Sequence, residues 1–244
     1  MSETRYVSTV GYLVGDSCLS IPRLVALCRH RDTKLVCGTY ALPVFEFAQK
    51  QVKGCDFEIV EKIEDPDDGA NKYTPGWGAP AYMRAASELQ EKHPGIIRLD
   101  ECTTGLDAPL RYPLELREAI EQGEHTTLHP YTRHEWKNLS DMLYRLKFKR
   151  PVHLVGCPNE PELKTCAEDL REKPFGEQAL DAICSFAVFG VASAFTCLAS
   201  LFLKRQYILS YTDDVSFWPH NPNAVKLKIP SQKEAQDLID REGL

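Results

Sequence analysis

Hydroxyl and basic side chains gather near the middle of the chain, directly after a short apolar strand that ends near His129. Thr132, Arg133 and Lys137 come just before or at the start of a helix, which apolar spacing predicts over residues 138–147. The free N–H groups and the dipole of a helix start favour an anion. These side chains predict a phosphate site, with the alternative that Thr132 only caps the helix.

An acidic residue follows the next predicted strand, residues 152–155. Strand, loop, helix and strand in this order form the repeat of a doubly wound sheet, whose ligands bind outside the carboxyl ends of the strands. Glu160 lies in the loop after such an end, where an acid commonly accepts hydrogen bonds from ribose hydroxyls. The alternative is a first-turn acid that complements a helix dipole. We interpret the two loops together as part of a nucleotide-binding half-domain.

The amino-terminal half must position a second candidate, Asp16. A strand predicted over residues 6–14 leads into Gly15, whose turn would place Asp16 at the carboxyl end of the strand, before a helix over residues 21–30. The alternative role of Asp16 is to cap that helix. Strands and helices then alternate, which predicts an α/β fold with a parallel sheet covered by helices. The further predicted elements are strand 35–37, helix 43–52, strand 57–60, helix 81–93 and strand 96–99.

A linker between two domains is expected at residues 101–113, which lack periodicity and contain Gly105 and two prolines. The predicted domains are therefore 1–112 and 113–244, the second beginning with a helix over residues 114–120.

Residues 64–80 form a long predicted loop that is rich in turn-forming residues and carries two aromatic side chains. Such a loop inside a compact domain is usually functional or disordered. A functional loop would be a lid or an acceptor contact, with Tyr73 and Trp77 as stacking surfaces. The alternative is a solvated loop without a binding role.

Residues 182–203 contain no charged side chain and are long enough to span a membrane. Gly190, Ser193 and Ala194 interrupt this run, and further hydroxyl side chains lower its hydropathy. We therefore expect no membrane span, but a buried strand over residues 182–189 joined to a buried helix over residues 195–203. A strand over residues 206–210 and a helix over residues 231–242 complete the predicted second domain.

The composition is that of a globular protein, with 43% hydrophobic and 26% charged residues and a net charge of −6. A chain with this net negative charge is not expected to have the extended basic surface that binds nucleic acid. The one basic cluster, residues 145–150, is assigned to the end of the preceding helix, where cations complement the dipole. Nine cysteines without a Cys-x-x-Cys pair, and a polar start without a secretory signal, predict a cytoplasmic protein without a structural metal.

Two stretches resemble glycosyltransferase family 9, the group that contains the ADP-heptose:lipopolysaccharide heptosyltransferases. The first stretch reads Leu128-His129, Thr132-Arg133, Trp136-Lys137 and then Gly156-x-Pro158-x-Glu160. The second, Gly15-Asp16-Ser17-Cys18-Leu19-Ser20-Ile21-Pro22, is similar to the amino-terminal Gly-Asp loop of the family. The resemblance covers most of the chain, which is shorter than typical members. It implies two facing Rossmann-like domains of the GT-B type.

The resemblance also implies roles for individual residues. In the family, the positions matched by Thr132 and Lys137 contact the diphosphate, and the position matched by Glu160 contacts the ribose. The residue matched by Asp16 is thought to be the catalytic base. The resemblance thus implies a donor site in the second domain and a base in the first.

One family motif, Asp-[Ser/Thr]-Gly-x-x-His at a helix start, is largely missing. The matching residues are Ala192-Ser193-Ala194-Phe195-Thr196-Cys197, so the hydroxyl of Ser193 is kept and Thr196 offers a second one. Such a helix start can still bind phosphate through its N–H groups. The loss of the Asp, Gly and His puts the identity of the donor, and the activity itself, in question.

We expect a metal-independent inverting glycosyltransferase that moves a sugar from a nucleotide-diphosphate donor to a glycan or other hydroxyl acceptor. Asp16 would deprotonate the acceptor, and Arg133 and Lys137 would stabilise the departing diphosphate in place of a metal ion. The only Asp-x-Asp pattern, Asp65-Pro66-Asp67, lies in a predicted loop and not at a strand end. The alternative is a nucleotide or nucleotide-sugar binding protein without catalysis. A variant with a modified nucleic-acid base as acceptor is disfavoured by the acidic charge.

Overall fold

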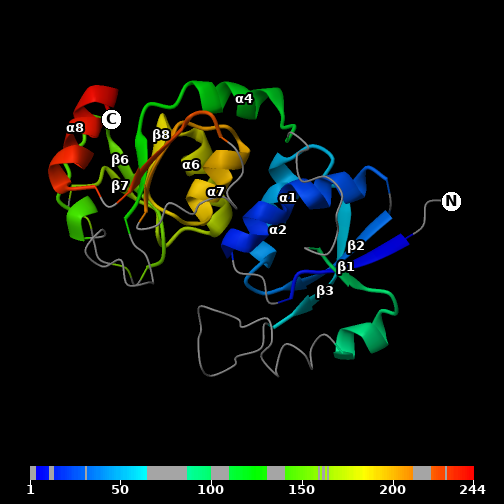
Figure 1. Cartoon of the computed structure of the whole chain (residues 1–244). Coiled ribbons are helices and arrows are strands. Elements are labelled where there is room, and N and C mark those ends of the chain that lie inside the picture. Colours follow the sequence, from blue (N-terminus) through cyan, green and yellow to red (C-terminus); the bar gives the residue numbers. More distant parts are fainter. Residues whose placement is uncertain are drawn as a thin grey trace. The chain divides into compact units, whose positions relative to one another are not determined.

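The computed structural model describes residues 4–10, 14–30, 32–64, 87–99, 110–130, 141–158, 160, 163, 165–210, 221–228 and 230–244. The chain divides into two compact units, Met1–Pro113 and Leu114–Leu244 (Figure 1). The division predicted from the sequence, after residue 112, lies one residue earlier.

The first unit contains a parallel sheet of four strands in the order β3-β2-β1-β4. Its strands are β1 (Thr4–Ser8), β2 (Asp32–Gly38), β3 (Phe57–Ile63) and β4 (Ile97–Arg98), and its described helices include α1 (Val14–Cys28) and α2 (Leu42–Gln51). Residues 87–92 are also helical, which places the end of the helix predicted over residues 81–93. The alternation of strands and helices predicted for this half is confirmed.

The prediction for the start of α1 was wrong. β1 ends at Ser8, and α1 begins at Val14 instead of Ile21, so Asp16 lies in the first turn of the helix and not in a loop before it. Proline is common in the first turn of a helix, and Pro22 therefore suggested that the helix begins there. Cys18, Ile21 and Val25 are fully buried at helical spacing. The apolar face therefore continues upstream of the proline, and its burial offsets the hydrogen bond that Pro22 cannot donate.

The second unit contains six parallel strands in the order β10-β9-β8-β5-β6-β7. They are β5 (Thr126–His129), β6 (Val152–Leu154), β7 (Glu168–Asp169), β8 (Ala187–Val191), β9 (Gln206–Ser210) and β10 (Ala224–Lys228). The chain runs from β5 outward to β7 and then returns to place β8 on the other side of β5. This is the strand order of dinucleotide-binding folds, and the order reverses between β5 and β8.

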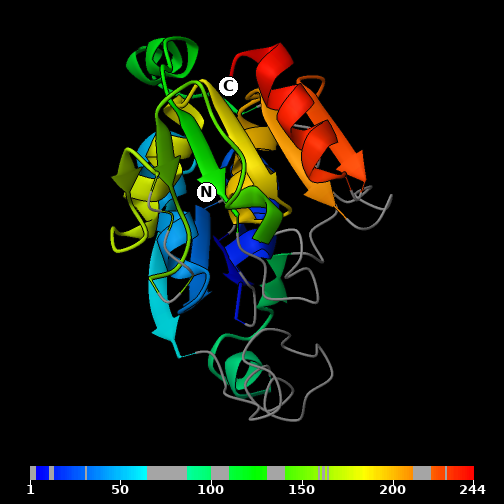
Figure 2. The same ribbon diagram turned by 90° about the vertical axis from the view of Figure 1, so that its left-hand side faces the viewer.

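Helices cover both faces of this sheet (Figure 1). On one face, α8 (Gln232–Glu242) packs through Leu238 and Ile239 in a cluster that includes Leu128 and Phe189. On the other face, α6 (Phe175–Cys184) and α7 (Ala194–Leu201) pack in a cluster around Val188. Figure 2 views the unit from the side of α8. Val188 and Phe189 pack on opposite faces of the sheet because successive side chains of a strand alternate in direction.

The apolar run is divided differently from the prediction. Residues 182–184 are the last turn of α6, and the buried strand is β8 at residues 187–191, followed by α7. Gln178, Ala179, Ala182 and Ile183 form the buried face of α6, so the apolar residues before β8 follow a helical period that begins upstream of the run. No helix in the described ranges has the length and apolar character needed to cross a membrane.

The basic cluster does not end a helix. Residues 141–143 are helical and a turn follows, so the helix predicted to reach residue 147 stops earlier. Lys149 forms an ion pair with Asp240 of α8, with Nζ 3.5 Å from Oδ1. Arg150 donates from Nε to the carbonyl oxygen of Gly243 at 3.0 Å, and its guanidinium lies 3.6 Å from the ring centre of Phe186. These two cations hold the carboxyl terminus against the sheet.

Candidate functional site

The carboxyl ends of β5 and β8 meet where the strand order reverses, and a glycine allows the close approach. Gly190 pairs with His129 and has φ +154°. A Cβ atom on Gly190 would lie 2.2 Å from the carbonyl oxygen of His129, closer than any side chain could tolerate. This point of the sheet is where doubly wound folds bind their ligands.

The carboxylate of Glu160 lies beside this point, and its side chain is only 4% exposed. Its Oε1 atom is 3.9 Å from Nε2 of His129. Its Oε2 atom is buried and has no hydrogen-bond partner among the residues that the structure describes. The carboxylate folds over Gly156, where φ is +141° and a Cβ atom would lie 2.1 Å from Oε2. The Gly156 and Glu160 positions are therefore sterically coupled.

Hydrogen bonds hold the described residues of the loop that carries Glu160. Gly156 N–H donates to Gln178 Oε1 at 2.8 Å, and Glu160 N–H donates to the carbonyl oxygen of Cys157 at 3.1 Å. Arg171 donates to the carbonyl oxygen of Glu160 at 2.5 Å and to Asp169 at 2.6 Å. The hydrogen bonds from Arg171 hold the pKa of Asp169 below its ordinary value. These hydrogen bonds anchor Gly156 and the backbone of Glu160 within the second unit.

His129 connects this loop with the start of α7. Its ring centre is 5.4 Å from that of Phe195, in the first turn of α7. Its Nδ1 atom is buried and, like Glu160 Oε2, has no partner within the described part of the chain. A buried polar atom without a partner is costly and uncommon. Two such atoms, on side chains that approach each other to 3.9 Å, indicate a place where an external polar group binds.

The start of α7 is closed by a capping box. Ser193 N–H donates to Thr196 Oγ1 at 2.8 Å, Thr196 Oγ1 donates to the carbonyl oxygen of Ser193 at 2.9 Å, and Ser193 Oγ accepts from Thr196 N–H at 3.5 Å. Thr196 is fully buried. Both hydroxyls predicted to contact a ligand therefore have partners within the chain. The N–H groups of Ala194 and Phe195 have no intrahelical partner, as in any first helical turn.

The remaining predicted residues are divided between the two units and the undescribed segments. Asp16 belongs to the first unit, where its backbone is in the first turn of α1, and its side chain lies outside the described part. Thr132, Arg133, Lys137, Tyr73 and Trp77 also lie outside the described residues. The structure brings together Glu160 and the helix start at Ser193 and Thr196, with His129 between them.

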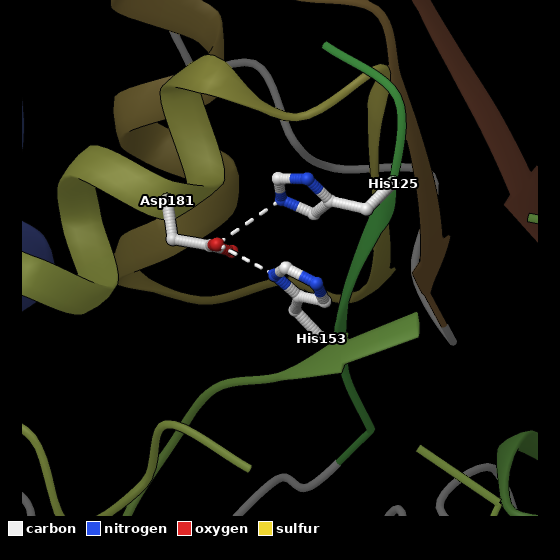
Figure 3. Close-up of side chains that lie close together, drawn as sticks. All are labelled: His125, His153 and Asp181. Atoms are coloured by element: carbon white, nitrogen blue, oxygen red, sulfur yellow. Dashed lines mark hydrogen bonds and ion pairs between the residues drawn. The ribbon is translucent and has the colours of Figure 1, made fainter. Parts of the chain in front are cut away.

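A second polar cluster was missed. His125, His153 and Asp181 lie close together in the second unit (Figure 3). Burial acts to raise the pKa of Asp181, but the neighbouring rings of His125 and His153 and the hydroxyl of Thr127 outweigh it, and the pKa is lowered. The 28-residue separation of the two histidines carries no motif. The only sequence signal was a histidine just before one predicted strand and another within the next.

By sequence alone, no family model and no curated protein matches this chain. Its fold does match solved structures. An Escherichia coli heptosyltransferase WaaC with ADP-2-deoxy-2-fluoro heptose is 12% identical, with a TM-score of 0.61 over 98% of this chain and 100% of the other. A glycosyl transferase family 9 structure from Veillonella parvula is 10% identical, with a TM-score of 0.58 over 99% and 90%.

A third match is E. coli ADP-heptose lps heptosyltransferase II, 10% identical, with a TM-score of 0.54 over 98% of this chain and 100% of the other. The predicted fold class, α/β with parallel sheets covered by helices, is confirmed. The fold of this chain is like that of the GT-B type heptosyltransferases of glycosyltransferase family 9.

Proposed function

We propose that the chain is an inverting glycosyltransferase that takes its sugar from a nucleoside-diphosphate donor without using a metal ion. The observation that carries this proposal is the buried Glu160 carboxylate, whose Oε2 atom has no partner in the described residues, beside the reversal of strand order. A carboxylate at this place in a doubly wound sheet accepts hydrogen bonds from the ribose hydroxyls of a nucleotide.

The diphosphate would bind next to the ribose. The first-turn N–H groups of α7 supply fixed partial positive charge at the neighbouring strand end. Thr132, Arg133 and Lys137 belong to the loop after β5 and would add hydroxyl and cationic contacts. Together these groups would stabilise the negative charge that develops on the leaving diphosphate, which is the work that a metal ion does elsewhere.

Asp16 is the proposed general base. It would take the proton of the acceptor hydroxyl while the acceptor oxygen forms a bond to the anomeric carbon of the sugar. The bond from that carbon to the phosphate oxygen breaks in the same step, and the nucleoside diphosphate leaves. The acceptor is a glycan or another molecule with a free hydroxyl group.

A second candidate function is binding of a nucleotide sugar without transfer. Its support is that Ser193 and Thr196 satisfy each other in the capping box, in a helix start that lacks the acidic and histidine side chains of the family motif. The two functions differ in whether bound donor decays. An enzyme of this kind releases sugar slowly to water, whereas a binding protein leaves its donor intact.

The test is incubation of the chain with a panel of nucleotide-diphosphate sugars, in the presence of a chelator, followed by assay of free nucleoside diphosphate. ADP-sugars come first, because two of the similar structures hold ADP or an ADP-heptose analogue. We expect donor hydrolysis that persists with the chelator. Intact donors throughout the panel, with binding retained, would favour the second function.

The proposed base is tested by Asp16→Asn. The backbone of Asp16 lies in the first turn of α1, and Asn is as favourable as Asp at a helix start. We expect donor turnover to fall by about two to four orders of magnitude, the usual contribution of a positioned base, with nearly unchanged thermal stability and nucleotide affinity. Turnover close to that of the unchanged chain would remove Asp16 from the mechanism.

A further inference from the structure

Three side chains from three elements of the second unit point at one another (Figure 3). His125 directly precedes β5, His153 is on β6, and Asp181 is on α6. Nδ1 of His153 is 2.8 Å, and Nε2 of His125 is 3.1 Å, from Oδ1 of Asp181. The two imidazole rings are stacked, with centres 3.8 Å apart. Each residue offers one ligand atom, and these atoms all lie within 4.8 Å of one another.

A fourth ligand, the carboxylate of Glu168, is within reach. Oε2 of Glu168, on the neighbouring strand β7, is 4.0 Å from Nδ1 of His153. The Glu168 side chain is 55% exposed, so it can move toward the cluster without disturbing the core. Two imidazoles and two carboxylates are a ligand set that zinc accepts.

Hydrogen bonding does not fully account for the cluster. Nε2 of His125 is near Asp181 Oδ1, but its geometry is not that of a hydrogen bond, and this buried nitrogen has no hydrogen-bond partner in the described residues. The other carboxylate oxygen, Oδ2, accepts a hydrogen bond from Thr127 Oγ1 at 2.8 Å. A hydroxyl that orients the carboxylate in this way is the support that metal ligands usually receive.

Three of the six separations among the four candidate ligand atoms can be compared with those around a tetrahedral ion. With ligand bonds of about 2.1 Å, such an ion separates its ligand atoms by roughly 3.4 Å. The present separations of 2.8, 3.1 and 4.0 Å lie on both sides of this value. Binding of the ion would require the stacked imidazole rings to rotate, because both nitrogens must point their lone pairs at one atom.

We propose that His125, His153, Asp181 and Glu168 form a zinc site. The site lies apart from the proposed nucleotide site. His125 and His129 lie at opposite ends of β5, about 13 Å apart along an extended strand. The ion would join β5, β6, β7 and α6, and its role is to stabilise the second unit. The sequence had predicted no structural metal, because only cysteine spacing was considered.

The experiment uses the full chain, freed of metal with a chelator and kept reduced. Zinc is titrated by calorimetry, and cobalt is substituted for visible spectroscopy. We expect one equivalent, a melting temperature that rises with free zinc, and a four-coordinate cobalt spectrum without the charge-transfer band of a thiolate ligand. The thiolate band separates this site from adventitious binding to the cysteines. Failure of the chain to bind either ion would show that the cluster is only a hydrogen-bonded network.

Variants locate the ion. His153→Ala should abolish binding, and Thr127→Val should weaken it by about 10- to 100-fold. The matched control is His93→Ala in the first unit, where His93 Nε2 pairs with Glu61 Oε2 at 2.9 Å outside the cluster. We expect the control to bind zinc as the unchanged chain does. Binding that survives His153→Ala, or that is lost in His93→Ala, overturns the proposal.

His153→Ala could fail to fold, because its ring packs on His125. In that case the zinc affinity of Glu168→Gln is measured instead, since this exposed side chain can be replaced without disturbing the packing of the core. A zinc affinity lowered about tenfold or more supports the site. An unchanged affinity overturns it.

Discussion

Gly156 must lack a side chain for the Glu160 carboxylate to lie where it does. A methyl group at this position would meet Oε2 of Glu160 at 2.1 Å, and the end of that flexible side chain is what would move. We predict that Gly156→Ala lowers the affinity for a nucleoside diphosphate by about 1–3 kcal/mol, as much as Glu160→Gln does. Calorimetry on both single variants and the double variant measures this coupling.

The two changes remove the same contact, so the double variant should lose little more affinity than either single one. The control is Gly176→Ala in the first turn of α6, where a Cβ atom would meet nothing within 4 Å. It should leave the affinity unchanged. Fully additive losses, or an unaffected Gly156→Ala, would mean that the carboxylate does not touch the nucleotide.

Lys204 makes stability depend on pH. The residue is buried, and its Nζ donates to the carbonyl oxygen of Ile120. Burial lowers its pKa from 10.5 to about 8; the nearby charge of Cys184 opposes this shift and that of Arg205 adds to it. Between these two pKa values the unfolded chain binds more protons than the folded one, so this residue makes folding more favourable as pH rises.

We predict that the stability of the unchanged chain relative to Lys204→Met increases by about 1–2 kcal/mol from pH 8 to pH 10.5, allowing for solvent screening. The comparison with Lys204→Met is needed because Cys28 and Cys55 have pKa values raised to about 11 and 12 and act in the opposite direction. Denaturant unfolding at several pH values provides the data. If the difference in unfolding free energy between the two proteins stays constant or falls as pH rises, the pKa of Lys204 is not lowered in the folded chain.

At the scale of residues, the sequence could indicate Glu160 because its place after a strand is a local pattern. It could not indicate the contact of Glu160 with His129, since that pair forms only when β5 and β6 lie side by side. The mutual bonds of Ser193 and Thr196 were visible in principle, because a hydroxyl residue three positions after another is the spacing of a capping box.

At the scale of elements, the contact of β5 with β8 depends on Gly190. Because a methyl group there would meet backbone atoms of His129 at 2.2 Å, the strands themselves would have to separate. We predict that Gly190→Ala costs about 2–4 kcal/mol of unfolding free energy. Gly176→Ala again serves as the control and should cost almost nothing. Denaturant unfolding that shows equal stability for both variants would refute this account of the strand reversal.

The elements that the sequence predicted well are those with a complete local signal. The strand at residues 206–210 and the helix at the carboxyl terminus are confirmed, and Ser231, the first residue of the predicted helix, is the N-cap of α8. β7 and β10 were not predicted, because β7 has two exposed residues and β10 carries charged side chains on an edge of the sheet. Edge strands lack the apolar pattern by which buried strands are recognised.

At the scale of the whole molecule, the alternation of strands and helices was enough to predict two parallel sheets covered by helices. The order of the strands was not predictable from alternation, since it depends on where the chain crosses back. The crossing from β7 to β8 through α6 creates the reversal at which Glu160 and His129 lie. The candidate site is thus a product of topology more than of any single motif.

We expect the second unit to bind a nucleoside diphosphate through Glu160. Calorimetric titration of ADP into the unchanged chain, Glu160→Gln and Glu177→Gln tests it directly. Glu177 is an exposed acid in the first turn of α6, so its replacement makes the same chemical change at a solvent-exposed side chain.

We expect saturable binding to the unchanged chain, the same affinity for Glu177→Gln, and an affinity lower by about 1–3 kcal/mol for Glu160→Gln, because a charge-assisted hydrogen bond is lost. All three proteins should have similar melting temperatures. Equal ADP affinity in Glu160→Gln and Glu177→Gln would contradict the proposed nucleotide site.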